Sequence, residues 1–416
     1  MKRLTKLLAV LLAVLLPLAG CQSDTSWVYS YSGGRTIPAG LYIYLQMQSF
    51  SEAFSALYQE EMDEYLATLS ATPTDAEASA APEEAKSVYD MEYDEILAQQ
   101  VEDVPVSQWV DKNSDTLARR FMTAQVKLEE LGKSLTEEQL ALYKNTARQA
   151  FASAAYSYDA TGNPISGEKY FTGMGVSESS LALAYQYSDT LALHFEALYG
   201  KGGELEVPED EILAYFKDNF VRGQQIVMAK PTEDDMPQIL NPGEGELDED
   251  AQAAVDLIAE QNETALVAME AELKALADSL YGRMQAGEAI EELTLEYDKY
   301  NSADGTAEIK ETGSLDFIVL NDDYSAYGQE VVDGLAALEP GKSSLIENDT
   351  SFILIRRLDL MEKPEDLEAH RLGLLIDLRY ESDYLPKLDA WAAELPVTVN
   401  ENAISRYVSG KLKMGM

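Results

Sequence analysis

The stretch "VPEDEILAYFKDNFVRGQQIVM", residues 207–228, contains the point at which the residue pattern changes from helical to strand-like. Pro208 begins a helical pattern, and three acidic residues fill its first turn, where carboxylates complement the helix dipole. After Phe220 the helical pattern stops, and residues 224–229 form a short, β-rich run. The sequence therefore predicts a helical part that is followed by a mixed part beginning with a strand.

Helical periodicity dominates the chain before this point. It predicts helices over residues 41–69, 106–131, 136–157 and 177–199, with Ser134, Thr136 and Ser177 as candidate N-caps. Two segments differ in composition. Residues 70–87 are small, polar and proline-containing, which indicates a loop or a flexible insertion. Residues 23–34 are polar and glycine-rich, which indicates a tether.

After the change, strand and helix patterns mix. The predicted order is an acidic insertion (231–250), helices (251–287 and 289–297), an extended segment (312–320), a helix (327–338), a turn (339–344), a β-rich run (351–360), a helix (365–395) and a final extended segment (395–408). This order predicts an α+β fold, with a mostly helical domain and a small α/β domain.

The amino terminus has the pattern of an export signal. Three basic residues precede an apolar run at residues 7–18, which is too short to span a bilayer comfortably. "LAGC" at residues 18–21 resembles the lipobox of bacterial lipoproteins. That resemblance implies cleavage before Cys21 and attachment of lipid to it; the alternative is a plain secretory signal with a chance cysteine. Because Cys21 is the only cysteine, the mature chain folds without disulfides.

Charge and composition exclude several kinds of site. The formal net charge of −43 repels nucleic acid and anionic headgroups, so neither is an expected partner. One cysteine and two distant histidines, His194 and His370, do not provide a zinc site. Residues 159–170 lack the glycine and glutamate of a calcium loop, and nucleotide-binding motifs are absent. We therefore expect no metal and no cofactor.

Three stretches resemble extracytoplasmic foldases of the SurA/PrsA type, which join a helical chaperone domain to a parvulin-like prolyl isomerase domain. They are residues 173–200 leading into 207–228, the turn "GSLDFI" (313–318), and 331–359 with its helix, turn and closing strands. The resemblance implies a signal peptide (1–20), a tether (21–36), a chaperone domain (37–221) with an insertion (70–87), a parvulin-like domain (222–362) with an acidic insertion (231–250), and a C-terminal helical segment (363–416) that packs back on the chaperone domain.

The sequence departs from the family at its catalytic positions. Active parvulins carry a histidine on the first strand, immediately before an aliphatic pair, and here Gln225 stands before Ile226 and Val227. A second histidine belongs on the closing strand, but residues 349–358 contain none. We therefore assign no catalytic residue and regard the parvulin-like domain as degenerate, with isomerase activity weak or lost.

Aromatic residues on the first long helix suggest where polypeptides could bind. Tyr42, Tyr44, Met47 and Phe50 are candidates for contacts with extended, apolar client segments, because tyrosine faces and methionines adapt to varied partners. The alternative is that these side chains belong to the core and its boundary.

Together these features predict a chaperone or foldase that is anchored through the Cys21 lipid to the outer face of the bacterial cytoplasmic membrane. Its expected partners are unfolded or newly exported polypeptides and the membrane. Two alternatives remain. The chain could be an active parvulin-type isomerase, or a solute-binding lipoprotein, which would require strand–helix alternation in two lobes.

Overall fold

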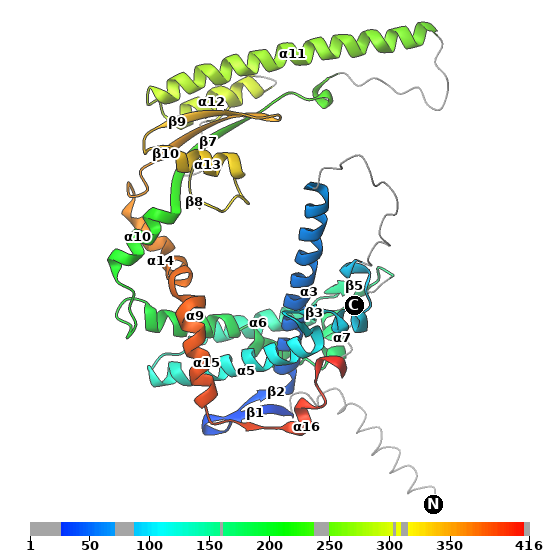
Figure 1. The fold of residues 1–416 in the computed structure, drawn as a ribbon, viewed down its shortest axis with the longest axis vertical. Helices are drawn as coiled ribbons and strands as arrows, with labels where there is room; N and C mark the ends of the chain where they lie inside the picture. Colours follow the sequence, from blue (N-terminus) through cyan, green and yellow to red (C-terminus); the bar gives the residue numbers. More distant parts are fainter. Residues whose placement is uncertain are drawn as a thin grey trace, which may run out of the picture. The chain divides into compact units, whose positions relative to one another are not determined.

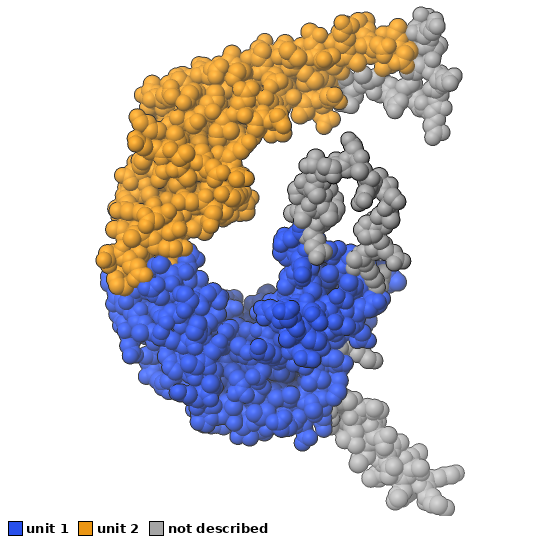
Figure 2. Space-filling model, viewed as in Figure 1, with its two compact units in different colours: residues 1–207, 375–416 blue, residues 208–374 orange. Residues whose placement is uncertain are grey.

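The computed structural model describes residues 26–70, 87–158, 161–236, 249–302, 305–308 and 315–411. It divides into two compact units, shown in Figure 2. Unit 1 comprises residues 1–207 and 375–416, and unit 2 comprises residues 208–374. Across the described ranges, no helix is both long enough and apolar enough to cross a membrane.

Unit 1 is mostly helical, with three small sheets (Figure 1). Its elements are β1 (Trp27–Tyr31), β2 (Arg35–Pro38), α3 (Ala39–Ser70), α4 (Tyr93–Ala98), β3 (Gln100–Val101), β4 (Val104–Pro105), α5 (Val106–Glu130), α6 (Glu137–Ala152), β5 (Ser157–Tyr158), β6 (Pro164–Ile165), α7 (Gly167–Met174), α8 (Glu178–Ala184), α9 (Tyr187–Tyr199), α15 (Leu385–Glu394), β11 (Thr398–Val399) and α16 (Glu401–Ile404).

Of the three predicted caps in unit 1, Thr136 and Ser177 are N-caps and Ser134 is not. The Thr136 hydroxyl accepts a hydrogen bond from the Gln139 amide, and the Gln139 side chain accepts one from the Thr136 amide, which makes a complete capping box. The Ser177 hydroxyl accepts from the Ser180 amide in the same way. The helix predicted over 177–199 is two helices, α8 and α9, which meet at residues 185–186.

The N-terminal segment differs from the tether expected over residues 21–36. Residues 27–38 form the hairpin of β1 and β2, which pairs with β11 in an antiparallel three-stranded sheet. Tyr29 lies opposite Val399, and Val28, Tyr29 and Tyr31 are buried. The glycine-rich run that suggested a tether is the turn of this hairpin, where Gly33 has a φ of 69°.

Unit 2 contains a four-stranded antiparallel sheet in the order β8-β7-β10-β9. Its elements are α10 (Glu209–Asn219), β7 (Phe220–Ala229), α11 (Glu249–Gln285), α12 (Ile290–Asn301), β8 (Asp316–Leu320), α13 (Gln329–Ala337), β9 (Ser343–Glu347), β10 (Ser351–Leu358) and α14 (Pro364–Arg379), which continues into unit 1. The α+β class predicted from the sequence is confirmed.

Each face of this sheet packs against a different set of helices. On one face, Ile226, Met228, Phe352 and Leu354 form a buried cluster with the C-terminal half of α11 and with α12. On the other face, residues of β7, β8 and β10 pack on α13. Gly223 of β7 permits the second contact, because a Cβ there would lie 2.5 Å from a methyl group of Leu335. The two faces therefore have separate cores.

The C-terminal helices return to unit 1. A π-helical turn, Tyr380–Tyr384, joins α14 to α15, and α15 packs along α5. Asp389 of α15 accepts two hydrogen bonds from the Arg120 guanidinium of α5, at 2.7 and 2.8 Å. A bidentate pair of this kind fixes the direction of α15 on the surface of α5.

Candidate functional site

Gln225 lies on β7, the second strand of the sheet of unit 2, and is half-buried. Its register partner on β10 is Ile355, which belongs to the α13 core, so both side chains project from the α13 face. The Gln225 Oε1 atom is buried and accepts no hydrogen bond within the described part of the chain. The amide side chain thus lies beside an apolar surface with an unused acceptor.

The neighbours of Gln225 on this face are apolar or aromatic, apart from Arg357 of β10, whose guanidinium donates to the Ala336 and Leu338 carbonyls. Val227, two residues further along β7, is 46% exposed, and its partner on β10 is Ile353. Phe317 of β8 lies opposite Gly223 and stacks on Tyr327 with ring centroids 3.8 Å apart. The Gln225 side-chain amide can donate and accept hydrogen bonds, but it neither gains nor loses a proton near neutral pH. This face can therefore contact an apolar chain, while its β7 and β10 residues provide no acid or base next to Gln225.

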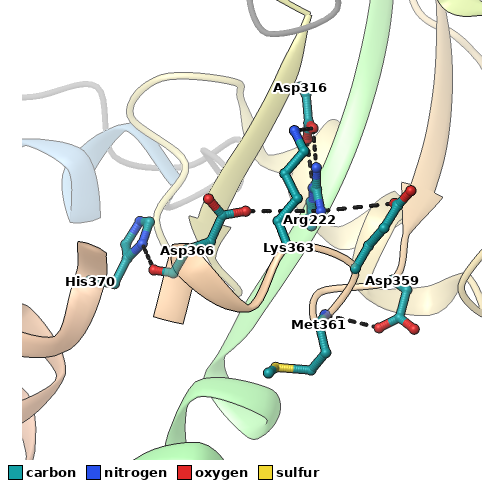
Figure 3. A network of polar contacts seen from close by, with 8 residues as sticks. Arg222, Asp316, Asp359, Met361, Lys363, Asp366 and His370 are labelled. Carbon is teal, nitrogen blue, oxygen red and sulfur yellow. Dashed lines mark hydrogen bonds and ion pairs between the residues drawn. The ribbon is translucent and has the colours of Figure 1, made fainter. Parts of the chain in front are cut away.

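The opposite face of β7 carries a buried ion-pair network. Arg222 is 1% exposed, and its Nε donates to Asp316 Oδ1 of β8 at 2.8 Å. Its Nη2 atom pairs with Asp316 Oδ2, which Lys363 Nζ also contacts at 2.9 Å. Asp366 and Glu362 approach Arg222 Nη1 at 3.9 Å. Figure 3 shows Arg222 between Asp316 and the segment that begins α14.

The electrostatics of this network favour the charged forms of Asp316 and Arg222. Burial alone would raise the pKa of Asp316, but the hydrogen bonds from Arg222 and Lys363 outweigh it, and the pKa is lowered. The hydrogen bond to Asp316 raises the pKa of Arg222, against the effect of burial. The network joins β7, β8 and the first turn of α14, so it fixes α14 where the chain leaves unit 2.

A second feature, in unit 1, is a run of half-buried aromatic and methionine side chains along α3, which we call the aromatic stripe. At 3.6 residues per turn they fall within about 80° of the helix circumference. The stripe comprises Tyr44, Met47, Phe54, Tyr58 and Met62 of α3 together with Tyr89. The Tyr89 ring is 66% exposed and makes edge contacts with Phe54 and Tyr58, at 5.2 and 4.9 Å between centroids.

The other end of the stripe continues into a group of tyrosines. Burial raises the pKa of Tyr44, and the nearby hydroxyls of Tyr156 and Tyr170 raise it further. Tyr156 is 42% exposed and contacts Tyr170 at 5.2 Å between ring centroids. Tyr158, on the β5–β6 hairpin, is 64% exposed. Aromatic surface is therefore accessible at both ends of the stripe.

The structure separates the four candidates for client contact. Tyr42 and Phe50 are buried, at 3% and 7% exposure, and they face the core rather than solvent. Tyr44 and Met47 are half-buried and belong to the aromatic stripe. Cys21 and most of the 70–87 insertion lie outside the described residues, as do residues 237–248 of the acidic insertion.

Sequence reasoning missed the ion-pair network and the exposed tyrosines. Arg222 and Asp316 are 94 residues apart, so no local pattern connects them. A signal for Arg222 did exist, since a basic residue in a strand with buried neighbours requires a partner. In the described ranges, no three metal-binding side chains gather into a possible metal site.

Comparisons with known proteins give the following similarities. No family model and no curated protein matches the chain. Three crystal structures of PrsA foldases are similar. The one from Streptococcus pneumoniae has a TM-score of 0.32 and 13% identity over 74% of this chain and 96% of that chain. The one from Lactococcus lactis has a TM-score of 0.31 and 13% identity over 72% of this chain and 90% of that chain. The one from Bacillus subtilis has a TM-score of 0.28 and 10% identity over 75% of this chain and 96% of that chain.

Proposed function

We propose that this protein is an extracytoplasmic chaperone that holds unfolded, newly exported polypeptides, and that its unit 2 has weak or no prolyl isomerase activity. Lipid on Cys21 anchors it to the outer face of the bacterial cytoplasmic membrane. The aromatic stripe on α3 is the observation that carries the proposal. Half-buried aromatic and methionine side chains offer apolar contact without requiring one partner sequence.

The charge around the stripe supports the same role. Asp90 and Glu92 are exposed beside Tyr89, and Glu61, which lies about 20° from the edge of the stripe on α3, accepts a hydrogen bond from the Val88 amide at 3.0 Å. Carboxylates at the rim keep an apolar surface soluble and attract chains that carry basic residues. The surface thus favours unfolded segments that combine apolar and basic side chains.

The geometry at Gln225 supports the loss of isomerase activity. Rotation about a prolyl bond has a barrier of roughly 20 kcal/mol, and catalysis requires polar groups that favour the twisted amide. On the α13 face Gln225 lies opposite Ile355 and diagonal to Ile353, whose side chains cannot form hydrogen bonds. The other diagonal neighbour, Arg357, already donates to the Ala336 and Leu338 carbonyls. The apolar surface can still bind proline-containing segments.

Replacing two tyrosines of the stripe is expected to impair client holding. In the double variant Tyr58→Ser/Tyr89→Ser, affinity for a chemically unfolded client should fall about tenfold, because each aromatic contact contributes about 0.5–1.5 kcal/mol. Light scattering during dilution of denatured client measures how much aggregation each variant prevents.

The matched control is Tyr300→Ser. Tyr300 lies on α12 of unit 2 and is 44% exposed, so the substitution makes the same chemical change away from the stripe. This control should suppress aggregation as well as the parent does. Equal performance of the double variant and the parent would contradict the proposal, provided that circular dichroism shows both to be folded.

The isomerase prediction is tested separately. In a protease-coupled assay with a proline-containing peptide, the parent protein should raise the rate little above the uncatalysed rate, and Gln225→Ala should match the parent. The reason is that Ile353 and Ile355, the β10 residues beside Gln225, provide no polar group that would stabilise the twisted amide. Turnover typical of an active parvulin would show that the site works without histidines.

A further inference from the structure

Helix α11 is longer than the sheet on which it packs. Its C-terminal half contributes Leu273, Ala277, Leu280 and Met284 to the core of unit 2. None of residues 252–269 is buried, and these 18 residues extend over about 27 Å. Figure 1 shows this half projecting past the strands. An unsupported helix of this length is only marginally stable in water.

The exposed half continues the apolar face of the buried half. Val255, Ile258, Leu266 and Met269 fall within the same arc of about 100° as Leu273 and Leu280, with Ala259 and Asn262 between them. Ile258 and Met269 are 38% and 37% exposed. We call the face formed by residues 255–269 the free seam. It has the spacing of one helix of a coiled coil, and the apolar side chains Val255, Ile258, Leu266 and Met269 are not buried against another described element.

One border of the free seam is a row of carboxylates. Asp256, Glu263 and Glu270 recur every seven residues, at the position that faces a partner's flanking side chains in a coiled coil. Glu270 already pairs with Lys230 at 2.8 Å, while Asp256 and Glu263 are exposed. Residues 249–270 contain no lysine or arginine. The seam is therefore apolar along its centre and negative along its edge.

We propose that the free seam of α11 docks an amphipathic helix of another protein, with leucine-like residues at its centre and lysine or arginine along its flank. Charge complementarity selects this occupant. A second copy of α11 would place carboxylates against carboxylates in an antiparallel pair and would supply no cation in a parallel pair. The neighbouring residues 237–248 contain three acidic residues and no basic ones, so their charge does not match either. This docking is separate from client holding by unit 1.

The test uses two synthetic 21-residue peptides and the full mature chain. One peptide carries leucine at heptad positions a and d with lysine at e and g; the other is a scrambled sequence of identical composition. Calorimetry should detect binding of the heptad peptide, and the scrambled peptide should bind at least tenfold more weakly. Leu266→Gln should weaken heptad-peptide binding about tenfold, because it removes one large apolar contact.

Charge reversal at the border of the free seam, compared with charge reversal away from it, distinguishes docking from non-specific electrostatic attraction. Glu263→Lys should weaken binding about threefold, as expected for an exposed ion pair, and Glu260→Lys, which points away from the seam, should leave it unchanged. Equal binding of the two peptides, or equal effects of the two substitutions, would overturn the proposal. So would sedimentation showing a dimer of the parent that Leu266→Gln dissociates, since the occupant would then be a second copy.

Discussion

Replacing Asp316 with alanine is expected to lower the free energy of unfolding of unit 2 by about 3–5 kcal/mol. The substitution leaves the guanidinium of Arg222 buried without its carboxylate, and Arg222 is 1% exposed. The other carboxylates near Arg222 lie 3.9 Å away, too far to take over both hydrogen bonds without movement.

The tryptophans make this effect measurable in the intact chain. Trp27, Trp109 and Trp391 all belong to unit 1. Unfolding followed by tryptophan fluorescence should therefore stay unchanged in Asp316→Ala, while a denaturation step seen by far-ultraviolet circular dichroism moves to lower denaturant. Glu362→Ala is the matched control. Glu362 faces the same guanidinium, but its side chain is 61% exposed, and its loss should change stability by less than about 1 kcal/mol.

A double variant separates a charge effect from a packing effect. If the loss comes from an unpaired buried charge, Arg222→Met/Asp316→Leu should recover most of the stability that Asp316→Ala loses, because both charges are then absent. A double variant as unstable as the single one would mean that the network holds unit 2 together through its ion pairs with Lys363 and Asp366.

Local signals in the sequence predicted most of the elements. Thr136 and Ser177 are caps in the structure because a hydroxyl that satisfies an exposed amide acts within four residues of its own position. The change of pattern after Phe220 marks the start of β7, and the long periodic segment at 251–287 is α11. Each of these features depends only on neighbours along the chain.

Features that depend on distant partners could not be predicted. The β1–β2 hairpin has the composition of a tether, and it becomes buried because β11 pairs with it more than 360 residues later. The aromatic residues of α3 show the same limit. Periodicity finds an apolar face but does not define which side of it neighbouring elements cover. Phe50 is buried against α4 and α5 and Tyr42 lies against Tyr29 of β1, while Tyr44 and Met47 pack on a cluster that includes α8 and stay half-buried.

His194 gives the structure a sensitivity to acid. It lies on α9 and is fully buried. Tyr384 Oη donates to the Leu191 carbonyl at 3.2 Å, so it accepts from His194 Nδ1 at 3.0 Å, and His194 Nε2 has no partner in the described chain. Burial and, secondarily, the positive charge of Lys127, opposed by the charge of Glu130, together lower the pKa of His194 from 6.5 to about 4. The neutral ring is therefore the folded form.

Acidification below pH 6.5 should consequently weaken unit 1. The unfolded chain binds a proton at this histidine near pH 6.5 and the folded chain only near pH 4, so protonation favours unfolding in that interval. The contribution of His194 to stability should fall by about 2 kcal/mol at pH 5 and about 3 kcal/mol at pH 4. Tryptophan fluorescence during urea unfolding measures it as the difference between the parent and His194→Leu, with His194→Gln as a second variant. Above pH 7.5 the stability curves of parent and variants should run parallel, because the ring is then neutral in both states. Curves that remain parallel down to pH 4 would show that the folded protein accommodates the charged ring.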